Sequence, residues 1–324
     1  MREAVFSSSS TGFRIRAAQG QAANHLASTG HRLAGFAERA AASLFFTLFP
    51  ADCRICGSPL FTVSRLPVCQ SCLTTLRPLQ GSYCPVCGQA SPPLSATRRE
   101  GEDVDPRCLL CQRVDPPFER AVAYGSYEGG LRDLIHLLKF HQVRPAAKVL
   151  GRVLAITLAG LERAMPVGTI AVVPVPLHKH KKAQRGFNQA EMIVRAALRQ
   201  LARPKRFDLC TGVLLRRRDT GSQIGLTSHE RRENLRGAFS VKDPTRILNR
   251  DILLVDDVYT TGTTASECAR VLLRAGAARV WVATVARTLK LSNVIELAGN
   301  EFKVPDSQFS EAVVTENWQP ATGN

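Results

Sequence analysis

The segment ILLVDDVYTTGTTASECARVL, residues 252–272, carries the clearest fold pattern in the sequence. Four apolar residues lead into Asp256 and Asp257, which predicts a buried parallel strand with both acids at its C-terminal edge. A polar glycine loop follows, and apolar residues then return at helical spacing. The loop comprises Thr260, Thr261, Gly262, Thr263 and Thr264. Such a junction binds anions through free N–H groups, so we predict a phosphate site whose carboxylates suit ribose hydroxyls or Mg²⁺. The structural alternative is a capped helix after an ordinary strand.

The composition predicts a soluble, cytoplasmic protein with an anionic partner. Hydrophobic residues make up 44% of the 324 residues, and the mean hydropathy is −0.06. No apolar run approaches the ~20 residues that a membrane helix requires. The formal net charge of +16 favours phosphates, nucleic acid or an acidic membrane surface as partners. Basic residues concentrate between His178 and Arg218.

Four CxxC pairs predict two structural zinc sites. Each pair places two thiols on one tight turn, the arrangement that zinc ribbons use. The expected ligands are Cys53, Cys56, Cys69, Cys72, Cys84, Cys87, Cys108 and Cys111. Pairing neighbours gives one zinc to the first four and one to the last four, while an interleaved arrangement stays open. Because no secretory signal is recognised, and a bridge within CxxC would close a strained ring, we expect zinc rather than disulfides.

The segment TIAVVPVPLHKHKKAQRGFNQAE, residues 169–191, predicts a second strand that ends at the same edge. Its prolines, Pro174 and Pro176 around Val175, stop the strand, and a basic cluster follows. We expect phosphate contacts from Lys179 and Arg185. A solvated charge run is the alternative, and His178 and His180 are candidates for an acid or base that nothing in the sequence orients.

Two further strands and two helices are expected around these segments. Residues 121–127 and 280–287 read as core strands, and residues 129–140 as a helix whose inner face includes Leu131 and Leu138. We place Lys139 on the solvated basic face of that helix. A second helix is expected from Ala146 to about Ala164. Glycines in residues 211–240 suggest a mobile loop between a strand and a helix.

The acidic strand end with its TTGTT loop closely resembles the signature of type I phosphoribosyltransferases. That resemblance implies an α/β fold of the phosphoribosyltransferase type, a parallel sheet flanked by helices, behind a small zinc-ribbon module. It implies Asp256 and Asp257 as catalytic residues that contact the ribose hydroxyls of phosphoribosyl pyrophosphate (PRPP). It also implies that residues 260–264 hold the 5-phosphate, and that the loop of residues 174–185 binds pyrophosphate.

The combination of VPVPLHK…QRGFNQAE, the cysteine-rich module and the PRPP motif is similar to the ComF family, which is associated with DNA uptake in bacterial competence. The resemblance covers roughly residues 40–290. It implies binding of PRPP or a 5′-phosphorylated ribose with Mg²⁺, linked to DNA uptake or nucleotide metabolism, with competence proteins as partners.

Two functions stay open at this point. One is a phosphoribosyltransferase, a glycosyltransferase of pentosyl groups, and no segment identifies its acceptor. The other is a non-catalytic factor that handles single-stranded DNA and reuses the fold.

The expected domain order has five parts. We expect a disordered extension (1–30), an amphipathic helix (31–50), a double zinc-ribbon module (51–115), a phosphoribosyltransferase-like domain (118–290) and an acidic disordered tail (291–324). The helix is expected to pack on the zinc module, with contact to a membrane interface as the alternative.

Overall fold

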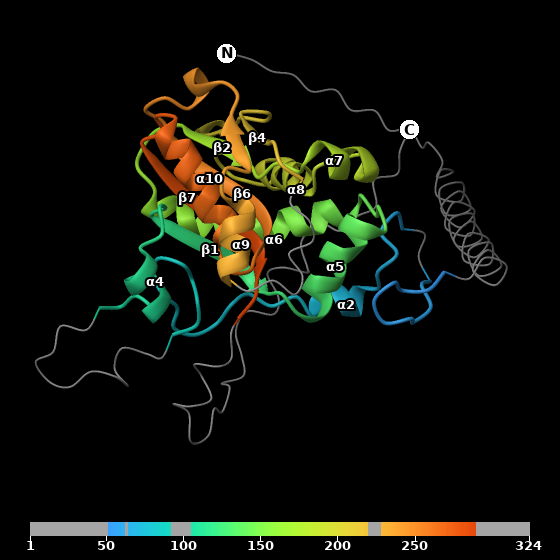
Figure 1. Ribbon diagram of the computed structural model, residues 1–324. Helices are drawn as coiled ribbons and strands as arrows, with labels where there is room; N and C mark the ends of the chain where they lie inside the picture. Colours follow the sequence, from blue (N-terminus) through green and yellow to red (C-terminus); the bar gives the residue numbers. More distant parts are fainter. Residues whose placement is uncertain (1–50, 62–63, 92–104, 220–227, 290–324) are drawn as a thin grey trace, which may run out of the picture. The chain divides into compact units, whose positions relative to one another are not determined.

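The computed structural model describes residues 51–61, 64–91, 105–219 and 228–289 (Figure 1). The extension, the first amphipathic helix and the acidic tail expected from the sequence lie outside these residues. The chain divides into two compact units, residues 1–53 with 57–67 and residues 54–56 with 68–324. In the first unit, a tight turn is closed by the Gly57 N–H donating to the Cys53 carbonyl at 2.8 Å.

A five-stranded parallel sheet forms the centre of the second unit. Its strand order is β1-β7-β6-β2-β3, and every neighbouring pair is parallel. The strands are β1 (Arg120–Ser126), β7 (Arg279–Arg287), β6 (Asp251–Tyr259), β2 (Ile170–Pro174) and β3 (Phe207–Leu209). The central strands β2, β6 and β7 are buried along most of their length because both faces of the sheet are covered. The α/β fold expected from the sequence is confirmed.

Strand β6 is longer than its apolar run predicted. Pairing with β7 continues past Val255, with Asp256 opposite Thr284 and Tyr259 opposite Arg287. Both acids therefore lie within the strand rather than beyond it. Because neighbouring side chains of a strand point to opposite faces, Asp256 and Asp257 are directed to different sides of the sheet.

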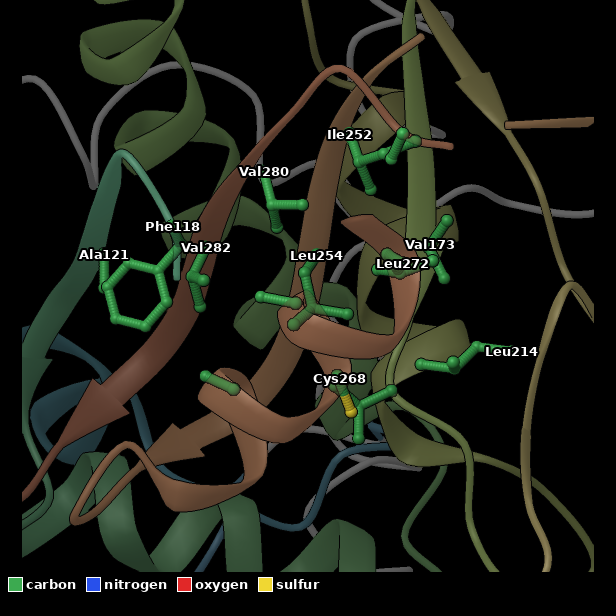
Figure 2. Packing of buried hydrophobic residues seen from close by; sticks show 14 of the residues in the cluster. Phe118, Ala121, Val173, Leu214, Ile252, Leu254, Cys268, Leu272, Val280 and Val282 are labelled. Carbon is green, nitrogen blue, oxygen red and sulfur yellow. The ribbon is translucent and has the colours of Figure 1, made fainter. Parts of the chain in front are cut away.

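Helices cover both faces of the sheet. The main helices are α5 (Gly129–Phe140), α6 (Ala146–Leu161), α7 (Lys179–Arg185), α8 (Gln189–Leu198), α9 (Ser228–Leu235) and α10 (Thr263–Arg274). Helix α10 buries Ala265, Cys268 and Leu272 in the core. Figure 2 shows Cys268 and Leu272 on the side of β6 that carries Ile252 and Leu254. This spacing of three and four residues is the amphipathic pattern expected of the segment.

The other face of the sheet is covered by α6 and α8, which pack closely against each other. A side chain at Gly151 of α6 would meet Ala196 of α8 at 2.5 Å, so the glycine permits this approach. The antiparallel pair β4 (Leu214–Arg216) and β5 (Phe239–Val241) adds Leu214 and Phe239 to the core beside α10. Short 3-10 turns lie at Glu162–Ala164, Pro204–Arg206 and Pro244–Arg246.

The segment around the third cysteine pair lies along β1, the outermost strand on one side of the sheet. The Ala121 N–H donates to the Val86 carbonyl at 2.6 Å, and the Leu79 N–H donates to the Tyr124 carbonyl at 2.7 Å. A side chain at Gly125 would come within 2.7 Å of the Arg77 carbonyl oxygen, so only glycine allows this contact. Two short helices belong to this part of the chain, α2 (Gln70–Thr74) and α4 (Leu109–Val114). Among all the helices that the structure describes, none has the length and apolarity needed to cross a membrane.

Candidate functional site at the carboxyl edge of the sheet

The segments that follow β2 and β6 meet at one edge of the sheet. Strands β2 and β6 are neighbours, and Pro174 lies opposite Val255 in their register. The Val175 N–H continues this ladder by donating to the Val255 carbonyl at 2.8 Å. The Pro174-Val175-Pro176 segment therefore lies directly beside the start of the acidic pair. This is the edge where open α/β sheets bind their ligands.

Asp257 is buried in an ion pair with Lys139. The Asp257 side chain is only 5% exposed, and its Oδ2 lies 2.5 Å from the Nζ of Lys139, which α5 supplies. Burial acts to lower the pKa of Lys139, but the carboxylates of Asp257 and Asp256 outweigh burial and raise that pKa. The expectation that Lys139 lies on a solvated face was wrong. The helix register brings its long side chain back to the sheet edge.

Asp256 forms no ion pair of this kind with any residue that the structure describes. Its Oδ1 accepts a hydrogen bond of 2.8 Å from the Asp257 N–H. Burial, reinforced by the charge of Asp257, raises the pKa of Asp256 well above its ordinary value, although Lys139 acts in the opposite direction. An ionised Asp256 is therefore stabilised by any cation or hydroxyl donor that enters the site.

The loop between β6 and α10 turns at a glycine and carries several hydroxyl groups. Gly262 adopts a left-handed φ of 76° at the N-cap of α10, and Thr261 and Thr263 share a hydrogen bond of 2.8 Å between their hydroxyls. The loop borders a small pocket whose lining includes Asp256, Tyr259, Thr260, Gly262 and Thr264. The free N–H groups of the first turn of α10 and the threonine hydroxyls are the donors available to a ligand.

Tyr259 covers this loop. A side chain at Gly262 would collide with the Tyr259 hydroxyl, so the ring lies against the glycine backbone. Tyr259 is buried, and burial raises the pKa of its phenol. A ligand at Gly262 would therefore contact this ring or move it.

The basic segment after β2 is a helix rather than the expected loop. Residues 179–185 form α7, which begins after His178 in an extended conformation and ends at Gly186 with φ 78°. Its lysines, glutamine and alanine favour a helix, and the glycine stops it. Lys179 is exposed, whereas the half-buried Arg185 donates to Gln189 Oε1 at 2.5 Å. The two residues from which we expected phosphate contacts therefore differ in exposure, and Arg185 already has a partner on α8.

The cysteines form two groups of four in the order of the chain. Cys53, Cys56, Cys69 and Cys72 make one group, and Cys84, Cys87, Cys108 and Cys111 make the other, with the sulfur atoms of each group within 4.8 Å of one another. The Cys56–Cys69 and Cys87–Cys108 sulfur pairs are each 3.6 Å apart. Four thiolates around tetrahedral zinc lie about 3.8 Å apart, given Zn–S bonds of about 2.3 Å. Both groups therefore fit zinc ribbon sites, and neighbouring pairs share a site as predicted.

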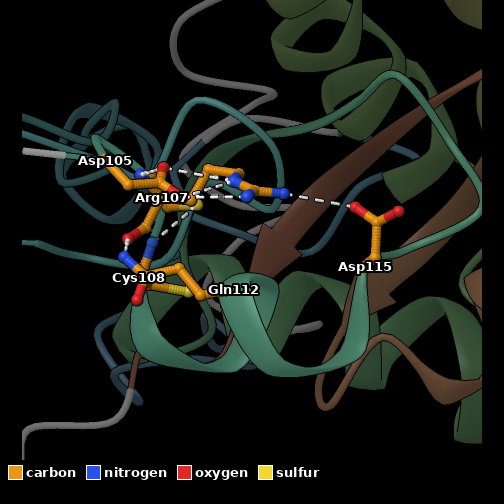
Figure 3. Close-up of polar contacts among 6 residues, drawn as sticks. Asp105, Arg107, Cys108, Gln112 and Asp115 are labelled. Atoms are coloured by element: carbon orange, nitrogen blue, oxygen red, sulfur yellow. Dashed lines mark hydrogen bonds and ion pairs between the residues drawn. The ribbon is translucent and has the colours of Figure 1, made fainter.

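Polar contacts hold the last cysteine pair in place. Figure 3 shows Arg107 between two acids, with its Nη2 2.8 Å from Asp105 and its Nη1 3.2 Å from Asp115. The Gln112 amide donates to the Arg107 carbonyl at 2.7 Å, and the Cys108 N–H donates to the Cys84 sulfur at 3.3 Å. These contacts join the residues before α4 to the residues within and after it. They hold Cys108 near the other three sulfur atoms of its group.

Arg287 links this ribbon to Tyr259, which precedes the loop of residues 260–264. The residue ends β7 and is only 3% exposed, although it carries a charge. Its guanidinium donates to the Cys87 carbonyl and, at 2.8 Å, to Gln89 Oε1. The same group lies 5.0 Å from the centre of the Tyr259 ring. No motif marked Arg287, and the only sequence signal was a charge that ends an apolar strand.

Comparison with known proteins agrees with this architecture. Residues 44–103 match the family model of the double zinc ribbon domain. The chain is 33% identical to DNA utilization protein YhgH of Escherichia coli K12 over 241 residues, which cover 74% of this chain and 98% of that protein. It is 28% identical to competence protein F of Haemophilus influenzae over 227 residues, which cover 69% and 92% of the two chains.

Solved structures of phosphoribosyltransferases are also matched, at low scores. One is the glutamine PRPP amidotransferase from Bacillus subtilis, with a TM-score of 0.26 and 24% identity over 43% of this chain and 26% of that chain. Another is a Trypanosoma cruzi hypoxanthine phosphoribosyl transferase, with a TM-score of 0.25 and 14% identity over 44% and 64% of the two chains.

The alignment with YhgH covers 98% of that relative at 33% identity. The chain therefore belongs to the ComF family of competence and DNA utilization proteins.

Proposed function

We propose that this protein binds PRPP or another 5′-phosphorylated ribose, together with Mg²⁺, at the carboxyl edge of β2 and β6. One observation carries the proposal. The carboxylates of β6, the glycine loop before α10 and the segment after β2 converge at this edge, where Val175 pairs with Val255 at 2.8 Å. A phosphate, a ribose and a second phosphate group each have complementary donors or acceptors within one site.

Each part of the ligand has an assigned set of residues in this proposal. The N–H groups and hydroxyls of residues 260–264 hold the 5-phosphate. Asp256 accepts from the ribose hydroxyls, and the neighbouring Asp257 pairs with Lys139. The Pro174-Val175-Pro176 segment, Lys179 and Arg185 face the pyrophosphate. These assignments match the phosphates to hydrogen-bond donors and cations, and the ribose hydroxyls to a carboxylate acceptor.

Asp256 also fits Mg²⁺. Magnesium prefers oxygen ligands and is held through one or two carboxylates plus the phosphates of a substrate. The pKa of Asp256 is raised by burial and by Asp257, so an added cation would relieve the cost of ionising it. Bound Mg²⁺ would neutralise charge on the pyrophosphate. Asp257 already has its counter-ion in Lys139, which leaves Asp256 as the carboxylate for the metal.

The names of two relatives support a link between this proposed binding activity and DNA. Relatives carry the names competence protein F and DNA utilization protein YhgH. We therefore propose that recognition of a phosphorylated ribose serves DNA uptake or the use of its nucleotides. Pentosyl transfer to an acceptor is the reaction that the ligand would allow.

Calorimetric titration with Mg²⁺ and PRPP tests the proposal. We expect saturable binding to the wild-type protein and at least a tenfold loss of affinity in Asp256→Asn. The matched control is Asp251→Asn, since Asp251 starts the same strand and pairs with Arg279 at the opposite edge of the sheet. Absence of heat at saturating PRPP would contradict the proposal, as would an Asp256→Asn protein that binds as well as the wild type.

Single-stranded DNA is the second candidate ligand, and α7 favours it. Lys179 and Lys182 of this helix are exposed, and Arg217 and Arg218 are exposed on the segment after β4. Backbone phosphates bind such surfaces with an affinity that falls with salt. We expect Lys179→Glu with Lys182→Glu to weaken binding of an oligonucleotide and to lower its salt slope by about 0.7 per lost phosphate contact.

The control for that measurement reverses two exposed lysines elsewhere, Lys148→Glu with Lys205→Glu. Both double variants change the net charge equally. Equal losses in the two would mean that DNA responds only to total charge, which would reject α7 as the binding surface.

A further inference from the structure

Two histidines and an aspartate form a third cluster of metal-ligand type. His178 is the N-cap of α7, His180 lies in its first turn, and Asp219 follows β4. The ligand atoms of the three side chains lie within 4.8 Å of one another. A parallel bridge between His178 and Arg216 brings the segment after β4 beside the start of α7. The cluster is thus built by two segments far apart in the sequence.

The distances match those between ligands that share one metal ion. Asp219 Oδ2 lies 3.3 Å from His178 Nδ1 and 3.1 Å from His180 Nδ1. Two ligands of a tetrahedral ion with bonds of about 2.0 to 2.2 Å are separated by about 3.3 to 3.5 Å. Both imidazoles therefore direct the same nitrogen toward one carboxylate oxygen at close to the spacing that an ion would impose.

Hydrogen bonding alone does not satisfy the buried ring of His178. The His180 ring forms a hydrogen bond with Asp219 Oδ2 at 3.1 Å. His178 is only 4% exposed, and its Nδ1 has no hydrogen-bond partner in the described part of the chain despite lying near the same oxygen. A buried ring nitrogen without a partner costs free energy, which a metal bond would recover.

We propose that His178, His180 and Asp219 bind a divalent transition metal ion such as Zn²⁺, Co²⁺ or Ni²⁺. Imidazole and carboxylate together suit these ions better than Mg²⁺, which prefers oxygen ligands. Three protein ligands leave a coordination position for water or an oxygen of a ligand, unlike the closed cysteine groups. Lys181 lies close by and weakens attraction for a cation, so this ion binds less tightly than the zinc of the ribbons.

Titration of Co²⁺ into the full-length protein with its cysteine groups loaded with zinc tests the proposal. Calorimetry counts the ions bound, and the cobalt spectrum identifies the ligands, because thiolate ligands give an intense near-ultraviolet absorption that imidazole and carboxylate do not. We expect one additional equivalent of Co²⁺ without the thiolate absorption. His180→Ala and Asp219→Asn should each weaken its binding at least tenfold.

These variants suit the test because the His180 side chain is 71% exposed and that of Asp219 is 40% exposed, so neither supports the core. His141→Ala removes an exposed histidine outside the cluster and should leave the titration unchanged. The proposal is overturned if no additional ion binds, if the spectrum shows thiolate ligation, or if both cluster variants bind Co²⁺ as the wild type does. The test does not involve PRPP, so its result is independent of the function proposed above.

Discussion

Replacing Lys139 by methionine should destabilise the fold strongly, because it removes the partner of the buried Asp257 carboxylate. The Lys139 and Asp257 side chains are 17% and 5% exposed, and their charged atoms are 2.5 Å apart. Removing one member of such a buried pair costs about 3 to 5 kcal/mol. We therefore expect a loss of this size in the free energy of unfolding at pH 7, measured by urea denaturation.

The double variant Lys139→Met with Asp257→Asn separates the ion pair from the packing of the two side chains. Once both charges are gone, no unpaired charge remains buried, so the double variant should be more stable than Lys139→Met alone. The control is Arg195→Met, which breaks a more exposed pair with Glu191 on α8 and should cost at most about 0.5 kcal/mol. A loss below about 1 kcal/mol in Lys139→Met, or additive losses in the double variant, would refute the reasoning.

Three other predictions follow from the site and the ribbons. Because folding raises the pKa of Asp256, the stability of the wild type falls as the pH rises above 3.8, the ordinary pKa of an aspartate. Asp256→Asn should therefore be more stable than the wild type at pH 7 and lose that advantage near pH 4, as measured by denaturation curves. Gly262→Ala should cost about 1 to 2 kcal/mol, because φ is 76° and Tyr259 occupies the space, and thermal unfolding measures the loss. Metal analysis of chelator-free protein should find about two zinc ions per chain, and removing them should lower the melting temperature, since Cys84 and Cys87 belong to the main core.

The sequence predicted the elements whose patterns are long and local. Strands β6 and β7 and helix α10 follow from apolar runs and helical spacing, and the CxxC pairs marked both cysteine groups. Strands β3 and β5 have three residues each, too few for a pattern to appear, and β4 was expected only as a strand of undefined bounds before the mobile loop. Helix α7 was missed because its residues have no apolar face, so only helix propensity and the terminal glycine indicated it.

Contacts between segments far apart in the chain could not be predicted from the sequence either. Lys139 looked like one of several basic residues on a helix, and only the fold brings its ammonium to Asp257. The same holds for Asp219, which the fold places beside His178, and for Arg287, which reaches the ribbon. In each case a charged residue lies where an apolar element ends, but its partner depends on the packing of the sheet.

The zinc ribbon beside β1 also limits where the chain can be truncated. An uncovered outer strand offers unpaired N–H and C=O groups to other chains and is a common origin of aggregation. Val86 and Leu79 bond to that strand here, and Arg287 depends on Cys87 and Gln89 for its hydrogen bonds. A fragment that starts at Phe118 would therefore expose the edge of β1 to pairing with other chains, and it would remove the hydrogen-bond partners of the Arg287 guanidinium. Fragments intended for expression or crystallisation should begin before the third cysteine pair, at or ahead of Arg77.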